Sequence, residues 1–261
     1  MDTSAGIAFK RRSGLIGASV EGTLEQLLAP GAASETLREA LWHHQVLAFE
    51  QLNPSAEELI ALASVFGSPS PPESYNVSHP DFDAITVFDS TGGYRADKWH
   101  CDASYRPEVP MGAALCLRKL PSVGGDTVFT NCYAAYDALS GGMKKLLENR
   151  RALHAISDDA GTEHPVVVSH PITNRPILFV NSIFTRSITN LPPSEAAIIL
   201  PFLLEHVTRP DFTYRHRWSE GDVVIWDNWS TQHYALLDYD EQRITHRVAL
   251  DGGPLGAAHL C

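Results

Sequence analysis

The sequence predicts a mostly β protein, a sandwich or barrel with flanking helices packed outside it, and three observations support this fold class. Short apolar runs separated by Gly, Pro and Asp recur from residue 84 to residue 250. Helical periodicity is confined to the first 67 residues and to two later inserts. No repeat, low-complexity tract or linker-like stretch divides the 261 residues, so we expect a single domain over 1–261.

The N-terminal part contains two expected helices with a strand between them. Apolar spacing is typical of a helix over 34–44, and the apolar run 46–49 is typical of a short buried strand. Ser55 and Glu58 form a capping-box pattern that should begin the second helix. We expect that helix to end at Gly67 in the left-handed conformation.

The remainder of the chain is expected to be strands interrupted by two helical inserts. The expected strands are 84–88, 112–117, 127–130, 177–180, 222–226 and 244–250. The inserts lie at about 133–147 and 194–206, and Pro201 within the second one implies a kink or a break.

Charge, cysteine spacing and apolar runs indicate which partners and which compartment to expect. Twenty basic against thirty-one acidic residues give a net charge of −11, which would repel nucleic acids and anionic membrane surfaces. The four cysteines form no C-x-x-C pair, and no run is long and apolar enough to span a membrane. The first residues lack a basic stretch followed by an apolar one, so we expect a cytoplasmic protein. A homo-oligomer is compatible with these features.

Trp99-His100-Cys101-Asp102 is the first candidate metal-binding motif. In an extended segment residues i and i+2 share a face, so His100 and Asp102 could bind one ion. The pattern is weak alone, because His79-Pro80-Asp81 also matches it and is more typical of a turn. Considered in isolation, a hydrogen-bonded surface pair explains His100 and Asp102 equally well.

A second histidine follows the strand expected at 222–226. His233 lies just beyond this strand, in the run Asp227-Asn228-Trp229-Ser230-Thr231-Gln232-His233. Two imidazoles and one carboxylate on one side of a metal form the facial triad that suits non-haem Fe(II), with positions left open for a cosubstrate and oxygen. The same ligands fit Zn²⁺, so the triad alone does not select the metal.

The last expected strand places Arg243, Thr245 and Arg247 on one face and His246 on the other. Two buried guanidinium groups need anionic partners, because an unpaired buried charge costs several kcal/mol. A guanidinium suits a carboxylate or sulfonate because it donates two parallel hydrogen bonds. The alternative is a solvated edge strand whose arginines pair with Asp238 or Asp240.

These motifs together resemble the taurine dioxygenase family of Fe(II)/2-oxoglutarate-dependent oxygenases. The resemblance rests on four motifs in order: Trp99-His100-x-Asp102, Gly124-Gly125-Asp126-Thr127, Asp222-x-x-Ile225-Trp226-Asp227-Asn228-x-x-Thr231-Gln232-His233-Tyr234-Ala235 and Arg243-Ile244-x-His246-Arg247. Weaker similarity near the start and in the middle extends it over nearly the whole chain. It implies a double-stranded β-helix, the cupin-like jelly roll.

The resemblance also implies roles for individual residues. His100, Asp102 and His233 would bind Fe(II) and form the catalytic centre. Thr127 and Arg243 would hold the distal carboxylate of the cosubstrate 2-oxoglutarate. O2 would then be consumed with release of succinate and CO2.

The expected primary substrate is a small anionic molecule, namely a sulfonate, a sulfate ester, an aryloxyalkanoate or a similar carboxylate. Arg247 would contact its anionic group or, in some members of the family, help to secure the cosubstrate. Members specific for taurine have a histidine just after the Phe-Gly that ends the second helix, but here no histidine occurs between Gly67 and His79. Taurine itself is therefore not the expected substrate.

The segment 152–163 is also shorter than the lid-like insert of those members. A shorter lid would leave the site more open or leave closure to other loops. Two rival interpretations remain open at this point. They are a Zn-dependent member of the same fold, which would not require Arg243 and Thr127, and a non-enzymatic binding module.

Overall fold

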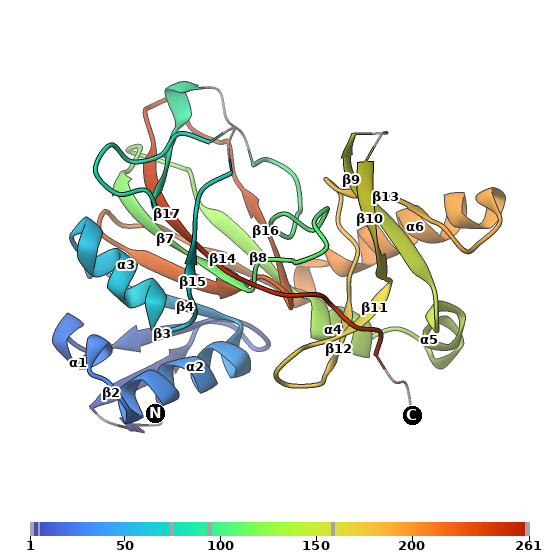
Figure 1. Cartoon of the computed structure of the whole chain (residues 1–261), viewed down its shortest axis with the longest axis horizontal. Helices are drawn as coiled ribbons and strands as arrows, with labels where there is room; N and C mark the ends of the chain where they lie inside the picture. Colours follow the sequence, from blue (N-terminus) through green and yellow to red (C-terminus); the bar gives the residue numbers. More distant parts are fainter. Residues whose placement is uncertain (1–2, 5, 74–75, 93–95, 158–159, 259–261) are drawn as a thin grey trace.

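Two antiparallel sheets facing each other make up the larger part of the molecule in the computed structural model, which describes residues 3–4, 6–73, 76–92, 96–157 and 160–258 (Figure 1). Apart from the parallel pair β3–β4, every strand pair in them is antiparallel. The larger sheet has the order β1 (Thr3–Ser4), β2 (Ile7–Arg11), β3 (Ala18–Glu21), β4 (Val46–Phe49), β15 (Val223–Asp227), β7 (Gly112–Lys119), β17 (Ile244–Leu250) and β5 (Pro69–Ser70), with β6 (Thr86–Asp89) also on β17. The smaller sheet has the order β14 (Thr213–His216), β8 (Thr127–Asn131) and β16 (Thr231–Ala235).

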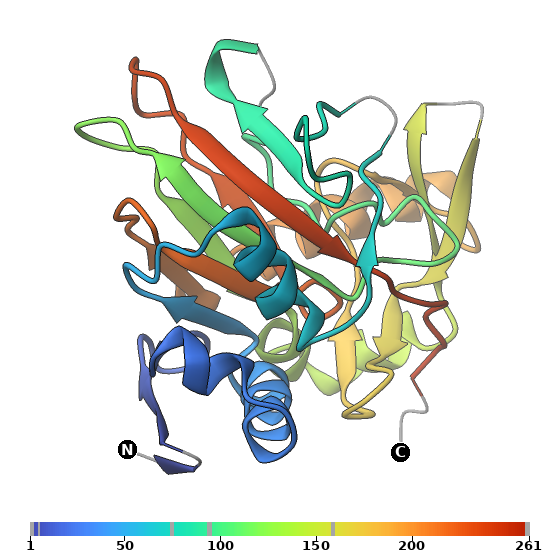
Figure 2. The ribbon, with the colours of Figure 1, turned by 60° about the vertical axis from the view of Figure 1, so that its left-hand side comes forward.

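Alternation along the central strands creates two cores. Val224 and Trp226 of β15 pack toward the smaller sheet, where they meet Phe129 of β8. Val223 and Ile225, on the opposite face of the same strand, pack toward the helices. Figure 2 shows these helices in front of the larger sheet; they are α1 (Leu24–Leu28), α2 (Ala32–His44) and α3 (Ala56–Ser64).

A second layer of small sheets and helices adjoins this sandwich, on the right in Figure 1. Its strands pair in the orders β10 (Ala160–Pro165), β9 (Arg151–Ser157), β13 (Thr185–Ile188) and β11 (Val167–Ser169), β12 (Pro176–Leu178). Its helices are α4 (Cys132–Asp137), α5 (Gly141–Leu147) and α6 (Pro193–Val207). Elsewhere in the chain, single 3₁₀ turns follow β6 at Ser90–Gly92 and precede β14 at Pro210–Phe212. The described residues of the short segment 152–163 belong to the paired strands β9 and β10.

The structure differs from the local predictions at three places. Helix α3 ends at Ser64, and Gly67 does not adopt a left-handed conformation; a Cβ atom there would lie 2.8 Å from the Met111 sulfur, so close packing accounts for the glycine. Of the kink or break expected at Pro201, the break does not occur, because helix α6 continues through this residue. The predicted insert at 133–147 forms two helices, α4 and α5, instead of one.

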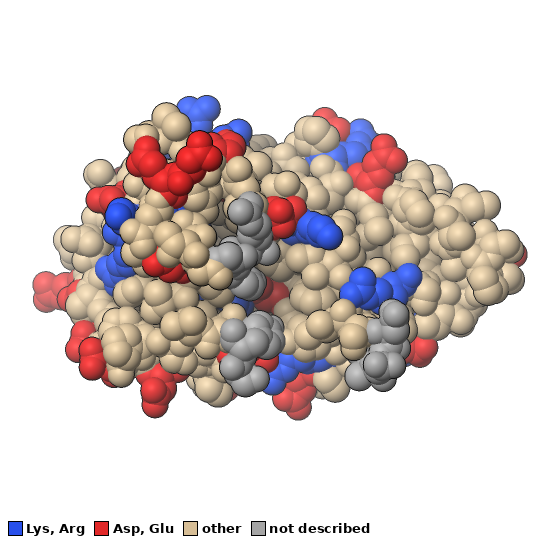
Figure 3. Space-filling view, turned by 90° about the horizontal axis from the view of Figure 1, so that it is seen from above, with Lys and Arg blue, Asp and Glu red and all other residues tan. Residues whose placement is uncertain are grey.

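Among the described residues, no helix has the length and apolar character needed to cross a membrane. Figure 3 views the molecule from above and shows acidic and basic side chains intermixed over that face, with no large area of one sign.

Candidate metal centre and adjoining cavities

The structure brings His100, Asp102 and His233 together in the interior. A pair of backbone hydrogen bonds joins the early segment to β16, since the His100 amide donates to the His233 carbonyl at 3.1 Å and the His233 amide donates back at 2.8 Å. One potential ligand atom from each of the three side chains lies within 4.8 Å of the others. The Nε2 atoms of the two histidines lie 3.7 and 3.8 Å from Asp102 Oδ1.

The protonation states suit these side chains to metal binding. His100 donates from Nδ1 to the Lys98 carbonyl at 2.7 Å, which leaves its Nε2 lone pair free to face the cluster. Burial lowers the pKa of His100, and burial together with the neighbouring His100 lowers the pKa of His233 to about 3. Both imidazoles are therefore neutral near pH 7, as metal ligands must be.

Asp102 is ionised in the same cluster. Burial is the largest influence on its pKa and would raise it, but Arg247 and the two imidazoles together outweigh burial, so the pKa lies below its usual value. Arg247 Nη2 donates to Asp102 Oδ2 at 2.8 Å. Two neutral imidazoles and one carboxylate form the donor set of a mononuclear divalent metal site with open positions, so these residues fit such an ion.

An inner cavity of about 80 Å³ adjoins the three side chains on the side of the smaller sheet, and Thr127 and Arg243 line it. The Nε and Nη2 atoms of Arg243 are buried and have no partner among the described residues. The Thr127 hydroxyl accepts a hydrogen bond from Trp218 Nε1 at 3.0 Å, so its own proton is free to be donated. This end of the cavity therefore offers a buried cation and a hydroxyl donor to an anion.

An outer cavity of about 380 Å³ opens on the other side of the cluster and shares His100, Asp102 and Arg247 with the inner one. Apolar side chains dominate its wall and come from the loop after β5, from the residues just before β7 and from the second layer: Pro71, Pro72, Pro110, Ile156, Ile183 and Phe184. Arg106, which pairs with Glu73 at 3.0 Å, also lines it. Its lining therefore suits a ligand that combines an anionic group with an apolar body.

The predicted face of β17 is present, with Arg243, Thr245 and Arg247 all lining the inner cavity. The solvated-edge alternative does not hold, because Asp238 pairs with Arg215 and Arg247 pairs with Asp102. His246 faces the helices instead, where its Nδ1 accepts a hydrogen bond from Arg118 at 3.3 Å.

Two features of the site had no signal in the sequence. Nothing in the pattern around Trp218 indicated that its indole would fix the Thr127 hydroxyl. The contact of Arg247 with Asp102 joins residues 145 positions apart and depends on how the chain folds. The competing motif at 79–81 lies elsewhere and forms a local turn, in which the Asp81 amide donates to His79 Nδ1.

A pair of facing sheets that holds two histidines and one carboxylate between them defines the class of jelly-roll metal-dependent oxygenases. The model of the Taurine catabolism dioxygenase TauD, TfdA family matches residues 8–249. The chain belongs to this family, and it is a 2-oxoglutarate-dependent dioxygenase with the predicted jelly-roll fold.

Curated relatives and a solved structure cover nearly the whole chain. The chain is 33% identical to an alkylsulfatase of Acinetobacter baylyi, over 97% of this chain and 87% of that protein. It is 31% identical to an alpha-ketoglutarate-dependent sulfate ester dioxygenase of Pseudomonas putida, over 92% of this chain and 88% of that protein. A taurine dioxygenase structure from Burkholderia xenovorans superposes with a TM-score of 0.87 at 30% identity, covering 98% of this chain and 95% of that one.

Proposed function

We propose that this enzyme binds Fe(II) through His100, Asp102 and His233 and oxidises a small alkyl sulfate ester, with 2-oxoglutarate and O2 as cosubstrates. The metal assignment is supported by the neutral imidazoles and the ionised carboxylate that converge on one point. Bound iron with 2-oxoglutarate would supply an oxidant strong enough for an unactivated C–H bond. Zn²⁺ is the other metal ion that these three side chains could bind. A zinc site would give the buried Arg243 beside the triad no role.

The single observation that carries the cosubstrate assignment is that two nitrogen atoms of the Arg243 guanidinium lack a hydrogen-bond partner. Its Nε and Nη2 atoms are buried without a partner among the described residues, at the end of a cavity that begins at the triad. A carboxylate there would accept two parallel N–H bonds from Arg243 and one O–H bond from Thr127. Held in this way, a diacid would leave its keto-acid end available to the metal that His100, Asp102 and His233 would bind.

Arg247 would serve two groups at once. Its bond to Asp102 Oδ2 fixes the carboxylate so that Oδ1 faces the two imidazole Nε2 atoms. The Nε atom of Arg247 is buried without a partner among the described residues, and the side chain also lines the outer cavity. It is therefore placed to donate to the anionic group of a substrate in that cavity.

The apolar wall of the outer cavity favours a sulfate ester that carries an alkyl chain. Ile156, Ile183 and Phe184 would bury the chain while Arg247 contacts the sulfate. Burial of each methylene contributes about 0.8 kcal/mol, so affinity should rise with chain length until the wall is covered. The names of the two curated relatives, an alkylsulfatase and a sulfate ester dioxygenase, support this choice.

The proposed reaction balances without a further reactant. Hydroxylation of the carbon that bears the sulfate gives a hemiacetal-type ester, which collapses to an aldehyde and sulfate as the C–O bond to sulfate breaks. One 2-oxoglutarate and one O2 are consumed, and one succinate and one CO2 are formed. The enzyme contributes by orienting the C–H bond and by excluding water from the buried triad.

The test is a substrate screen with Fe(II), 2-oxoglutarate and O2 that measures succinate, oxygen uptake and released sulfate. Primary alkyl sulfates should give sulfate and succinate in a ratio of one to one. Phe184→Ala should raise the KM of longer alkyl sulfates, whereas Ile172→Ala, at an exposed apolar residue outside the cavity, should not. Coupled turnover of aryloxyalkanoates or sulfonates with no sulfate released from any ester would overturn the substrate assignment.

A further inference from the structure

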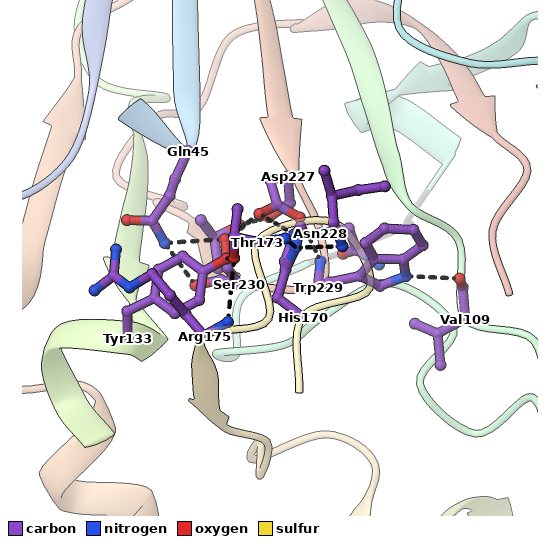
Figure 4. A network of polar contacts seen from close by, with 12 residues as sticks. Gln45, Val109, Tyr133, His170, Thr173, Arg175, Asp227, Asn228, Trp229 and Ser230 are labelled. Carbon is purple, nitrogen blue, oxygen red and sulfur yellow. Dashed lines mark hydrogen bonds and ion pairs between the residues drawn. The ribbon is translucent and has the colours of Figure 1, made fainter. Parts of the chain in front are cut away.

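The turn between β15 and β16 holds a network of polar contacts that the proposed reaction does not use (Figure 4). Asp227 ends β15 and Thr231 begins β16, so only Thr231 and Gln232 separate the turn between them from His233. Asp227, Asn228 and Ser230 are all buried. Buried polar groups of this kind are costly unless every one of them is paired.

The Asn228 side chain forms hydrogen bonds with the segment that carries the Asp102 carboxylate of the triad. Its Oδ1 accepts a hydrogen bond from the Asp102 amide at 2.7 Å, and its Nδ2 donates to the Asp102 carbonyl at 3.1 Å. The same Nδ2 donates to the Pro110 carbonyl at 2.9 Å. One carboxamide thus binds both polar groups of the Asp102 residue and ties them to the start of β7.

Asp102 needs this contact because it lies in a turn outside any strand. In the described part of the chain, no strand ladder includes the Asp102 peptide, whereas His100 and His233 are paired with each other through their backbones. The direction of the Asp102 side chain depends on the orientation of its backbone. Asn228 therefore replaces a strand partner at the one triad residue that lacks one.

The rest of the network holds Asn228 in place. The Asp227 carboxylate accepts hydrogen bonds from the Trp229 amide at 3.1 Å, from the Ser230 hydroxyl and from His170 Nε2 at 3.1 Å. His170 Nδ1 accepts from two backbone amides, so its proton is on Nε2 and points at Asp227. Gln45, after α2, donates to the carbonyl and the hydroxyl of Ser230 at 2.9 and 3.0 Å.

We propose that Asn228 is a positioning residue that sets the orientation of Asp102 and, through it, the affinity of the triad for its metal. This inference rests on the metal site proposed above. Groups that orient metal ligands typically change metal affinity by 10- to 100-fold when they are removed, although they do not touch the ion. A purely structural role predicts lower stability of the metal-free protein with unchanged affinity of the folded fraction.

The experiment measures Mn(II) binding to the metal-free full-length protein by calorimetry, under anaerobic conditions, beside urea unfolding of the same samples. Asn228→Ala should weaken Mn(II) binding by 10- to 100-fold relative to the wild type. Asn131→Ala is the matched control, because Asn131 is also a buried carboxamide with two hydrogen bonds, to Leu15 and Ala134, and neither partner belongs to the triad. This control should lose stability and keep wild-type affinity.

The outcomes separate this inference from the metal site itself. Absence of stoichiometric Mn(II) binding to the wild type, or binding that survives in His233→Ala, would contradict the metal site. Wild-type binding with equal affinity in Asn228→Ala, or an equal loss in Asn131→Ala, would overturn the role of Asn228. If Asn228→Ala does not fold, Asn228→Ser carries the same expectation, because its smaller side chain leaves room for water but cannot span both groups of Asp102.

Discussion

Replacing Arg243 by methionine should have opposite effects on cosubstrate binding and on the stability of the ligand-free protein. In the structure the guanidinium is buried, and its Nε and Nη2 atoms have no partner among the described residues. Burial is the main reason that the pKa of Arg243 lies below its usual value. Methionine replaces the aliphatic part of the side chain as far as the position of Nε and removes both the charge and the unpaired donors.

The size of each effect can be estimated from the contacts. Two charge-assisted hydrogen bonds to a carboxylate, at about 1.5–3 kcal/mol each, correspond to roughly 10²- to 10⁴-fold in the 2-oxoglutarate requirement. The ring of Trp218 lies 5.7 Å from the guanidinium carbon, and this cation–π contact stabilises the buried charge by only about 1 kcal/mol. Removing an unpaired buried cation should therefore leave the melting temperature of the ligand-free protein unchanged or raise it by a few degrees.

Arg247→Met is the matched control, because it makes the same substitution four residues further along the chain at a side chain that lines the same cavity. It breaks the contact with Asp102 and leaves that carboxylate without its cation, so it should lower the melting temperature of the ligand-free protein. Its effect on the 2-oxoglutarate requirement should be smaller than that of Arg243→Met. The assay pairs thermal unfolding without ligands with succinate formation against 2-oxoglutarate concentration, and the account fails if the two variants exchange these behaviours.

Three further predictions address the ligands, the cosubstrate and the fold. His100→Ala should abolish succinate formation, whereas His79→Ala, in the competing motif, should retain it when both are assayed under the same conditions. Thr127→Val should raise the KM for 2-oxoglutarate by about tenfold with little change in kcat, because it removes one hydroxyl donor worth about 1.5 kcal/mol to a charged group. Burial lowers the pKa of His154 to about 3, so the unfolded chain takes up a proton first as the pH falls below 6.5, and stability is lost with acid. His154 alone should account for about 2 kcal/mol of the fall in the free energy of unfolding from pH 7 to pH 5, and urea titrations that show no smaller fall in His154→Leu than in the wild type would contradict this.

Two strands could be located closely from the sequence. The run 46–49 and the strand 244–250 have the bounds that were expected, because each combines apolar residues with clear flanking breaks. β16 could not be recognised in this way, since Thr231–Ala235 is largely polar and faces the buried site. Local pattern therefore located the hydrophobic strands better than the strand that carries His233.

The site shows a similar division. The positions of His100, Asp102 and His233 were accessible from motifs, whereas their partners were not. Which donor satisfies Asp102 depends on long-range register, which brings Arg247 and Asn228 to it from two distant segments. Such contacts leave no periodicity in the sequence, because each is made only after the sheets have paired.

The most direct test of the central claim is anaerobic addition of Fe(II), and then of 2-oxoglutarate, to the metal-free protein while its visible absorption is recorded. The account predicts that a metal-to-ligand charge-transfer band develops only after both have been added, and that it is absent in His233→Ala. Stoichiometric iron binding that produces no such band with 2-oxoglutarate, or a band that persists in His233→Ala, would contradict the account.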